Sequence, residues 1–192
     1  MPDRIKLHDC EFSICQGDIF KAEAAGGFGE KYSVLVTGYN ALPEIDLEAE
    51  TRGDGRLAAL AALSARQPAT VFCGVKTRLA DFKHISVAVC HKGKLIDIVN
   101  RTSNPFGDEY CLSDKIKVFL TGRADIGVLV DSDVLIESNW EKTAPVCDVI
   151  LSIVAGSDPL LLDEATRIAA KYDVSALFVN DDDIRWKDGA YA

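Results

Sequence analysis

The sequence predicts a single α/β domain with a mixed β-sheet and helices packed against it. Short apolar and β-branched segments stand close together in the first half of the chain, as expected for strands that pair antiparallel. In the second half, strand-like and helix-like segments alternate, which is typical of βαβ units. A chain of 192 residues, of which 48% are hydrophobic and 27% charged, fits one compact domain.

The first half is expected to hold six strands and two helices. The strands are Ile5–Leu7, Phe12–Cys15, Tyr32–Thr37, Ala69–Val75, Ile85–Cys90 and Leu95–Val99, and the helices are Ile19–Ala25 and Leu57–Arg66. Leucines three residues apart give the second helix one apolar stripe that would pack on a sheet. The turn at His91–Lys94 joins the last two strands into a hairpin. Residues 40–54, which include Pro43 and Gly53, are expected to form a polar loop.

The second half begins with a loop over residues 101–114, which is rich in Asn, Pro, Gly and Asp. The elements expected after it are the strands Ile116–Leu120, Ile126–Val130, Val149–Val154 and Val174–Val179 and the helices Glu137–Ala144 and Leu160–Tyr172. The acidic run Asp181–Asp183 opens a polar segment. We therefore expect one domain over residues 1–180 and a polar acidic tail over residues 181–192.

Charge and cysteine usage exclude several classes of function. The formal net charge of −9, with scattered Lys and Arg, disfavours binding to nucleic acid or to anionic membranes. No apolar run is long enough to span a bilayer, and the amino terminus lacks the apolar core of a signal peptide. The six cysteines form no CxxC motif and no zinc-finger spacing. We expect reduced thiols in a cytoplasmic protein that holds no metal and no cofactor.

The most informative segment is the buried-strand pattern Ile126–Val130, which stops at two carboxylates, Asp131 and Asp133. In α/β folds, ligands bind at the carboxyl ends of strands. Two carboxylates at such an end can also hold Mg²⁺ and bridge it to a phosphate. This corner is therefore the candidate functional site.

Four segments carry recognisable patterns in a fixed order along the chain. They are Ala69–Val75 with the hairpin Ile85–Leu95, Asn100–Thr102 with Phe106–Tyr110, Ile126–Val130 with Asp133, and Asp163–Ala170 with Val174–Asn180. Together, over residues 32–180, they resemble the nitrilase (carbon–nitrogen hydrolase) superfamily. The resemblance implies a site in which a Glu base, a Lys and a Cys nucleophile hydrolyse an amide or nitrile through an acyl-enzyme.

The chain departs from that pattern at each catalytic position. Arg101 stands at the lysine position and Asp131 at the cysteine position. The glutamate position is open between Tyr39, which follows the strand ending at Thr37, and Glu44, five residues further on. Arginine keeps its proton at any working pH, and a carboxylate is a far weaker nucleophile towards amides than a thiolate. The resemblance therefore implies a relative that has lost the Glu-Lys-Cys chemistry.

The resemblance also implies an assembly. Superfamily members pack two such units into an α-β-β-α sandwich, so a homodimer is expected. Members continue through further strands beyond the position that matches Asn180, so this chain is expected to be shortened. Whether a partner supplies those strands stays open.

Three functional hypotheses follow. In the first, a non-hydrolytic protein binds a small polar ligand in a pocket formed by Tyr39, Glu44, Arg101, Asp131 and Asp133, where the arginine recognises a carboxylate or phosphate. In the second, the chain is an enzyme: a residual carbon–nitrogen hydrolase, or a metal-dependent glycosyl or phosphoryl transferase that uses Asp131-x-Asp133. In the third, side chains fill the pocket and the protein is a structural remnant.

Overall fold

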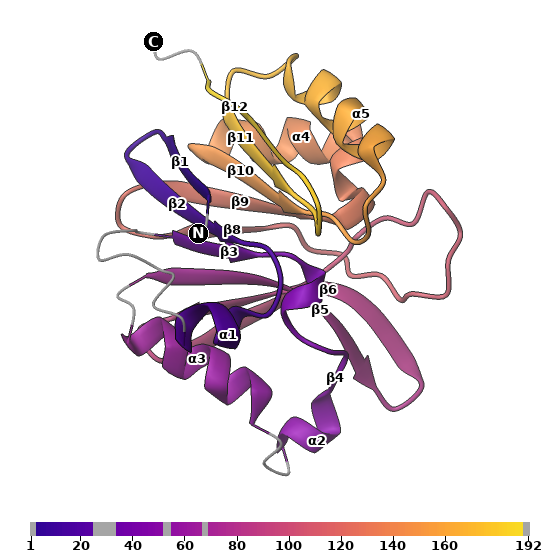
Figure 1. Ribbon diagram of the computed structural model, residues 1–192. Coiled ribbons are helices and arrows are strands. Elements are labelled where there is room, and N and C mark those ends of the chain that lie inside the picture. Colours follow the sequence, from indigo (N-terminus) through magenta and orange to yellow (C-terminus); the bar gives the residue numbers. More distant parts are fainter. Residues whose placement is uncertain (1–2, 25–33, 52–54, 67–68, 190–192) are drawn as a thin grey trace.

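Two β-sheets stacked face to face, with helices on both outer sides, form the architecture of the computed structural model (Figure 1). The structure describes residues 3–24, 34–51, 55–66 and 69–189. The prediction of an α/β fold with helices packed on mixed sheets is confirmed. The prediction of a single sheet is wrong. One chain contains two sheets, so the α-β-β-α layers form within it without a second copy.

The first sheet contains the strands of the amino-terminal half. They are β1 (Asp3–Leu7), β2 (Cys10–Cys15), β3 (Val34–Thr37), β4 (Ile45–Asp46), β5 (Thr70–Leu79), β6 (Phe82–His91) and β7 (Lys94–Asn100). Their order is β1-β2-β3-β5-β6-β7, and β4 pairs with β5 beyond the end of β3. The pairs β2–β3 and β3–β5 are parallel, whereas β1–β2, β5–β6 and β6–β7 are antiparallel.

The second sheet contains the strands of the carboxyl-terminal half. They are β8 (Lys117–Leu120), β9 (Asp125–Val130), β10 (Val149–Ile153), β11 (Ser175–Val179) and β12 (Ile184–Lys187). The order is β12-β11-β10-β9-β8, with a parallel centre of β9, β10 and β11 and an antiparallel strand at each edge.

The helices cover the outer faces of the two sheets (Figure 1). They are α1 (Ile19–Ala24), α2 (Leu47–Thr51) and α3 (Arg56–Arg66) on the first sheet, and α4 (Glu137–Thr143) and α5 (Pro159–Ala169) on the second. The Asp158 side chain caps α5 by accepting a hydrogen bond from the Leu160 N–H. No helix in the described ranges is long and apolar enough to cross a membrane.

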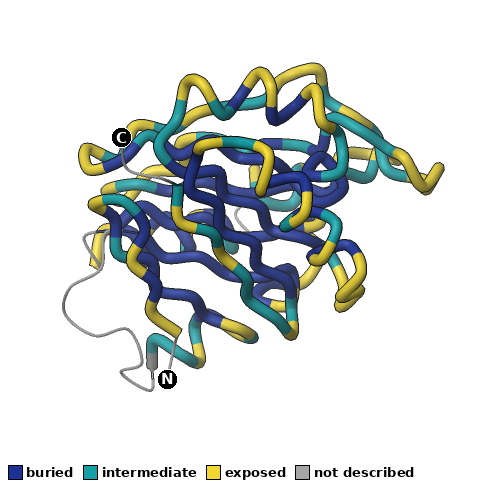
Figure 2. Tube along the Cα trace, turned by 90° about the horizontal axis from the view of Figure 1, so that it is seen from above, coloured by how far each residue is buried: buried dark blue, intermediate teal, exposed yellow. Residues whose placement is uncertain are grey.

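Alternation along the strands divides the core into three layers. Val34 and Val36 on β3 and Val128 and Val130 on β9 point into the space between the sheets. Leu35, between the first two, packs outward against α3, and Leu129, between the others, packs outward against α4 and α5. In Figure 2 the buried residues gather in the centre and exposed residues lie around them. Because both faces of the strands are covered, they are apolar at nearly every position.

The structure differs from the sequence-based expectation in two segments. The expected loop 40–54 contains the short strand β4 and the helix α2. Residues 184–187, expected in the polar tail, form β12, which pairs antiparallel with β11. The Asn180 side chain makes the turn before β12 by accepting hydrogen bonds from the N–H groups of Asp182 and Asp183. A short edge strand with polar residues has no apolar run that would identify it.

Close packing at Gly127 gives a testable prediction for the outer layer of the second sheet. A Cβ at this β9 position would clash with Thr143 Cγ2 on α4 and would lie 3.1 Å from Cys147 Sγ. We expect Gly127→Ala to lower the free energy of unfolding by about 1–3 kcal/mol, measured by urea denaturation. Thr143→Ser removes the clashing methyl group but keeps the hydroxyl that donates to the Asn139 carbonyl. The double variant should recover part of the loss; no recovery would contradict the proposed clash.

Candidate functional site

The candidate site lies where three strands end, two in the first sheet and one in the second. Tyr39 follows β3 in a short 3-10 turn, Arg101 follows β7, and Asp131 follows β9. All three are buried, and so is Asp133. Four of the five residues predicted from the sequence therefore meet at one corner between the sheets, which we call the corner site.

Arg101 is the centre of the corner site and is only 1% exposed. Its Nη1 donates to Asp131 Oδ2 at 2.9 Å and to Asp108 Oδ2 at 2.9 Å, and its Nη2 donates to Asp108 Oδ1 at 2.5 Å. The guanidinium also lies 5.8 Å from the ring centre of Tyr110. Burial by itself would lower the pKa of Arg101, but the hydrogen bonds to both carboxylates outweigh it and raise that pKa. Arg101 is thus a fixed positive charge.

Asp131 occupies a sharp corner of the backbone. Its φ is +53°, in the left-handed region that Asp and Asn enter more readily than most residues. Its Oδ2 accepts from Arg101, and its Oδ1 accepts from the Ala155 N–H, just after β10, at 3.0 Å. Both carboxylate oxygens are therefore engaged. Arg101, which comes after β7 of the first sheet, binds one, and the Ala155 N–H, which comes after β10 of the second sheet, binds the other.

Asp133 fixes the backbone of the loop that follows β7. Its carboxylate accepts hydrogen bonds from the N–H and the hydroxyl of Thr102 and from the N–H and the hydroxyl of Ser103, at 2.7–3.0 Å. Burial raises the pKa of Asp133, although these four donors oppose the shift. These hydrogen bonds hold the loop that follows β7 next to the sharp backbone turn at Asp131.

Two polar atoms of the corner site have no hydrogen-bond partner among the described residues: Tyr39 Oη and Arg101 Nε. Burial raises the pKa of Tyr39 well above its ordinary value, and the nearby charges of Asp131 and Asp133 raise it further. Tyr39 is therefore a neutral phenol that can donate or accept one hydrogen bond. A buried polar group without a partner is uncommon in a folded protein.

Glu44 lies apart from this cluster. Its side chain is 44% exposed and pairs with Arg78 on β5 at 3.5 Å. Among the described residues, no hydrogen bond or ion pair joins Glu44 to Arg101 or Asp131. Tyr39 lies in the corner site and feels the charge of Asp131, whereas Glu44 lies outside the site and pairs with Arg78.

Sequence reasoning missed three parts of the corner site. Asp108 belonged to a recognised segment but had no predicted role, although it is the second partner of Arg101. Thr102 and Ser103 were also given no role. Two hydroxyl residues after Arg101 in the sequence are only a weak indication that they bind a carboxylate. The Ala155 N–H has no signal in the sequence because a backbone donor depends only on where the chain turns.

Of the three cysteines in or beside apolar runs, Cys73 and Cys90 are buried in the core and Cys147 is partly buried. Cys73 and Cys90 lie in the outer core of the first sheet, and Cys147 packs against the second. Burial raises the pKa of Cys73 and Cys90 to about 12 and that of Cys147 to about 11. These thiols stay protonated at neutral pH and are poor nucleophiles.

Comparison with known proteins identifies the fold. No protein-family model and no curated protein matches the sequence. Among solved structures, a mutant of the Nesterenkonia AN1 amidase from the nitrilase superfamily matches 92% of this chain and 78% of its own, with a TM-score of 0.72 and 11% identity. A carbon–nitrogen hydrolase from Helicobacter pylori G27 matches 88% of this chain and 72% of its own (TM-score 0.68, 13% identity).

A third similar structure is XC1258 from Xanthomonas campestris, a CN-hydrolase superfamily protein. It matches 91% of this chain and 76% of its own, with a TM-score of 0.68 and 16% identity. The chain therefore has the fold of the nitrilase superfamily, as the sequence resemblance implied. At these identities the similarity establishes the fold only. The chemistry of this chain has to be inferred from the residues of the corner site.

The ion pair between Arg101 and Asp108 predicts how stability depends on pH. The hydrogen bonds from Arg101 hold the pKa of Asp108 below its ordinary value of 3.8. A lowered pKa in the folded state stabilises the fold above the ordinary value, and this contribution is lost as the pH falls through the folded-state pKa. We expect the stability difference between wild type and Asp108→Asn to be largest near neutral pH and to shrink on acidification. Urea denaturation of both proteins over a pH series measures this difference; a constant difference would contradict the ion pair.

Proposed function

We propose that the protein is a carbon–nitrogen-hydrolase-like binding protein that does not hydrolyse amides or nitriles. The observation that carries the proposal is the state of Asp131: one carboxylate oxygen is bound by Arg101 and the other by the Ala155 N–H. A carboxylate held by two donors is a weak nucleophile and a weak base. Arg101, which keeps its proton, cannot serve as a proton shuttle.

Ligand binding is supported by the two unpartnered atoms of the corner site. Arg101 Nε can donate one hydrogen bond to a ligand, and the Tyr39 hydroxyl can donate or accept one. Leaving a buried polar group unpaired costs about 1–3 kcal/mol, so a small molecule that pairs with both recovers that free energy. The matching ligand carries an oxygen acceptor, such as a short carboxylate or an amide carbonyl, and is small enough for a buried corner.

The metal-dependent transferase is less well supported. Such an enzyme needs the carboxylates of Asp131 and Asp133 to be open to a cation. Here Asp133 accepts hydrogen bonds from Thr102 and Ser103, and Asp131 is paired with a guanidinium. Cation binding would require both sets of contacts to break. A residual hydrolase that uses Glu44 as its base has no supporting contact among the described residues, because that side chain pairs with Arg78.

An assay of ammonia release from short amides, nitriles and N-carbamoyl compounds tests the absence of hydrolysis. We expect wild type, Asp131→Asn and a variant without cysteines to release ammonia only at the rate of the buffer. Asn is the matched replacement because it tolerates the left-handed backbone at residue 131. Turnover that is lost only in Asp131→Asn would make the protein a carboxylate-based hydrolase. Turnover lost only in the cysteine-free variant would place the nucleophile elsewhere.

Tyr39→Phe tests the ligand-binding part of the proposal. Removing a hydroxyl that is buried without a partner should raise the free energy of unfolding of the ligand-free protein by about 1 kcal/mol. The same variant should lose most of the thermal stabilisation that short carboxylates and amides give to wild type, measured by thermal unfolding. Arg101→Lys, which keeps the charge but lacks Nε, should also lose most of this ligand-induced thermal stabilisation. A destabilised Tyr39→Phe protein would mean that the hydroxyl has a partner in the free protein.

A further inference from the structure

A second candidate site lies at an edge of the sandwich, between β1 of the first sheet and β12 of the second. These two edge strands leave a hollow of about 330 Å³ between them. Its lining residues come from both strands and from the segments that follow β2 and β11: Asp3, Arg4, Ile5, Gln16, Asp182, Asp183, Ile184 and Trp186. None of them belongs to the corner site, so the hollow is independent of the proposed function.

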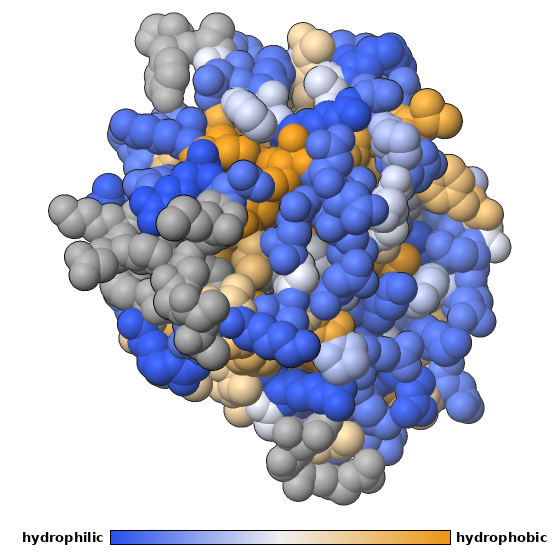
Figure 3. Space-filling model, in the orientation of Figure 1, coloured by the Kyte–Doolittle hydropathy of each residue, from blue (hydrophilic) through white to orange (hydrophobic). Residues whose placement is uncertain are grey.

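The walls of the hollow include an aromatic ring that the core leaves uncovered. Trp186 is paired with Leu177 and Ile184 with Val179, so both side chains point, like these partners, towards the first sheet. The first sheet ends at β1, however, and Trp186 remains 54% exposed. In Figure 3 a hydrophobic strip lies between hydrophilic surfaces in the region where β12 passes the β1–β2 hairpin. A ring on the inward face of a strand is thus available to a ligand.

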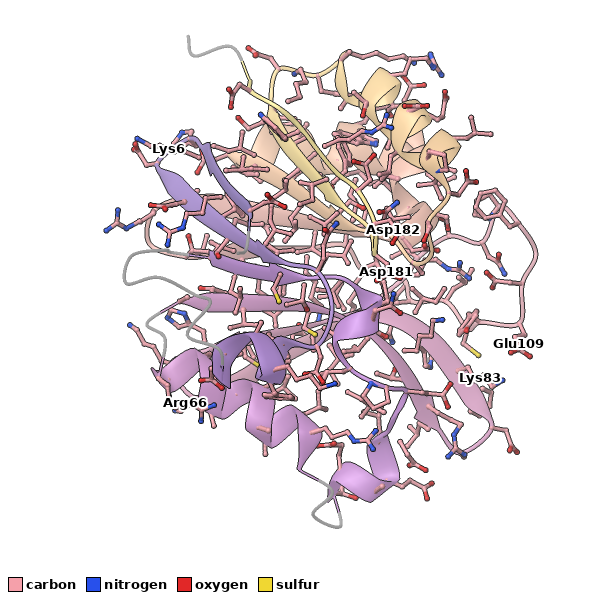
Figure 4. The ribbon with its side chains drawn as sticks, in the orientation of Figure 1. Lys6, Arg66, Lys83, Glu109, Asp181 and Asp182 are labelled. Carbon is pink, nitrogen blue, oxygen red and sulfur yellow. The ribbon has the colours of Figure 1, made fainter. Side chains whose placement is uncertain are left out.

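The rim of the hollow is acidic. Three carboxylates line it against one guanidinium, Arg4, and that guanidinium already pairs with Glu11 on β2 at 3.5 Å. Asp183 pairs with Arg185, but no hydrogen bond or ion pair within the described ranges engages the side chains of Asp3 or Asp182. Figure 4 places Asp182 at the turn between β11 and β12, where this residue is exposed. Two carboxylates without a partner among the described residues therefore border the hollow.

We propose that this hollow binds an organic cation, an ammonium group attached to an apolar body of a few carbon atoms. The ammonium group would lie on the face of Trp186, where the ring quadrupole attracts a cation, in the hollow that the carboxylates of Asp3 and Asp182 also line. The apolar body would cover Ile5 and Ile184. The volume is at the lower end of the range for small-molecule sites, which matches a ligand of this size.

Tryptophan fluorescence measures the binding directly. The chain has two tryptophans, and Trp140 is fully buried, so a ligand in the hollow changes the emission of Trp186 alone. The probes are choline and its neutral isostere 3,3-dimethylbutan-1-ol, which share shape and differ in charge. We expect a saturable change with choline, and binding of the isostere that is weaker by about tenfold, the ratio that corresponds to 1.4 kcal/mol.

Variants separate a specific site from a general charge effect. Asp3→Asn/Asp182→Asn should weaken choline binding several-fold, whereas Glu141→Gln, an exposed carboxylate on α4, should leave it unchanged. Trp186→Leu should abolish it, as measured by calorimetry, and circular dichroism should show that each variant is folded. Equal binding of choline and the isostere, an equal effect of Glu141→Gln, or no saturable change with choline would each overturn the proposal.

Discussion

The corner of this fold depends on one buried guanidinium shared by two carboxylates. Arg101 is almost fully removed from water, and a charge in that position is tolerated only when close counter-charges compensate for the lost hydration. Asp131 supplies one from the second sheet and Asp108 supplies the other from the loop between the sheets. The same contacts fix the backbone at Asp131, hold the loop that follows β7 at the end of β9, and engage the carboxylate on which the proposed function depends. The stability of the corner and the proposed absence of hydrolysis thus rest on a single interaction.

The three core layers explain how this fold forms with few residues in common with the similar structures. Inner and outer side chains alternate on β3 and β9, so each strand contributes to two layers at once. Any apolar residues of suitable size maintain these layers, because packing tolerates exchange among them better than it tolerates polar groups. This accounts for a TM-score of 0.72 at 11% identity. The fold therefore constrains the pattern of the sequence far more than the identity of its residues.

Much of the fold could be predicted from the sequence, and the corner site only in part. The strands and helices with continuous apolar patterns were found with small errors at their ends, since their burial determines their composition. β12 and α2 were missed because exposed, short elements carry no such pattern. The sequence was interpreted as one mixed sheet, whereas the chain forms two. The periodicity of apolar residues shows which residues are buried but not which element covers them. Asp131 and Asp133 were predicted from their position after a strand, and Tyr39 and Arg101 from the resemblance to the superfamily. The role of Asp108 depends on how a loop folds back, which spacing does not encode.

The chain passes between the two sheets once within the described ranges, through the loop that joins β7 to β8. Residues before this loop build the first sheet with α1 to α3, and residues after it build the second with α4 and α5. Each half is continuous in sequence, and the corner site lies on the seam, with Tyr39 and Arg101 on one side and Asp131 and Asp133 on the other. The protein is therefore organised as two complementary fragments. A break in the exposed part of that loop would cut no strand of either sheet and would turn folding of the whole into association of two polypeptides.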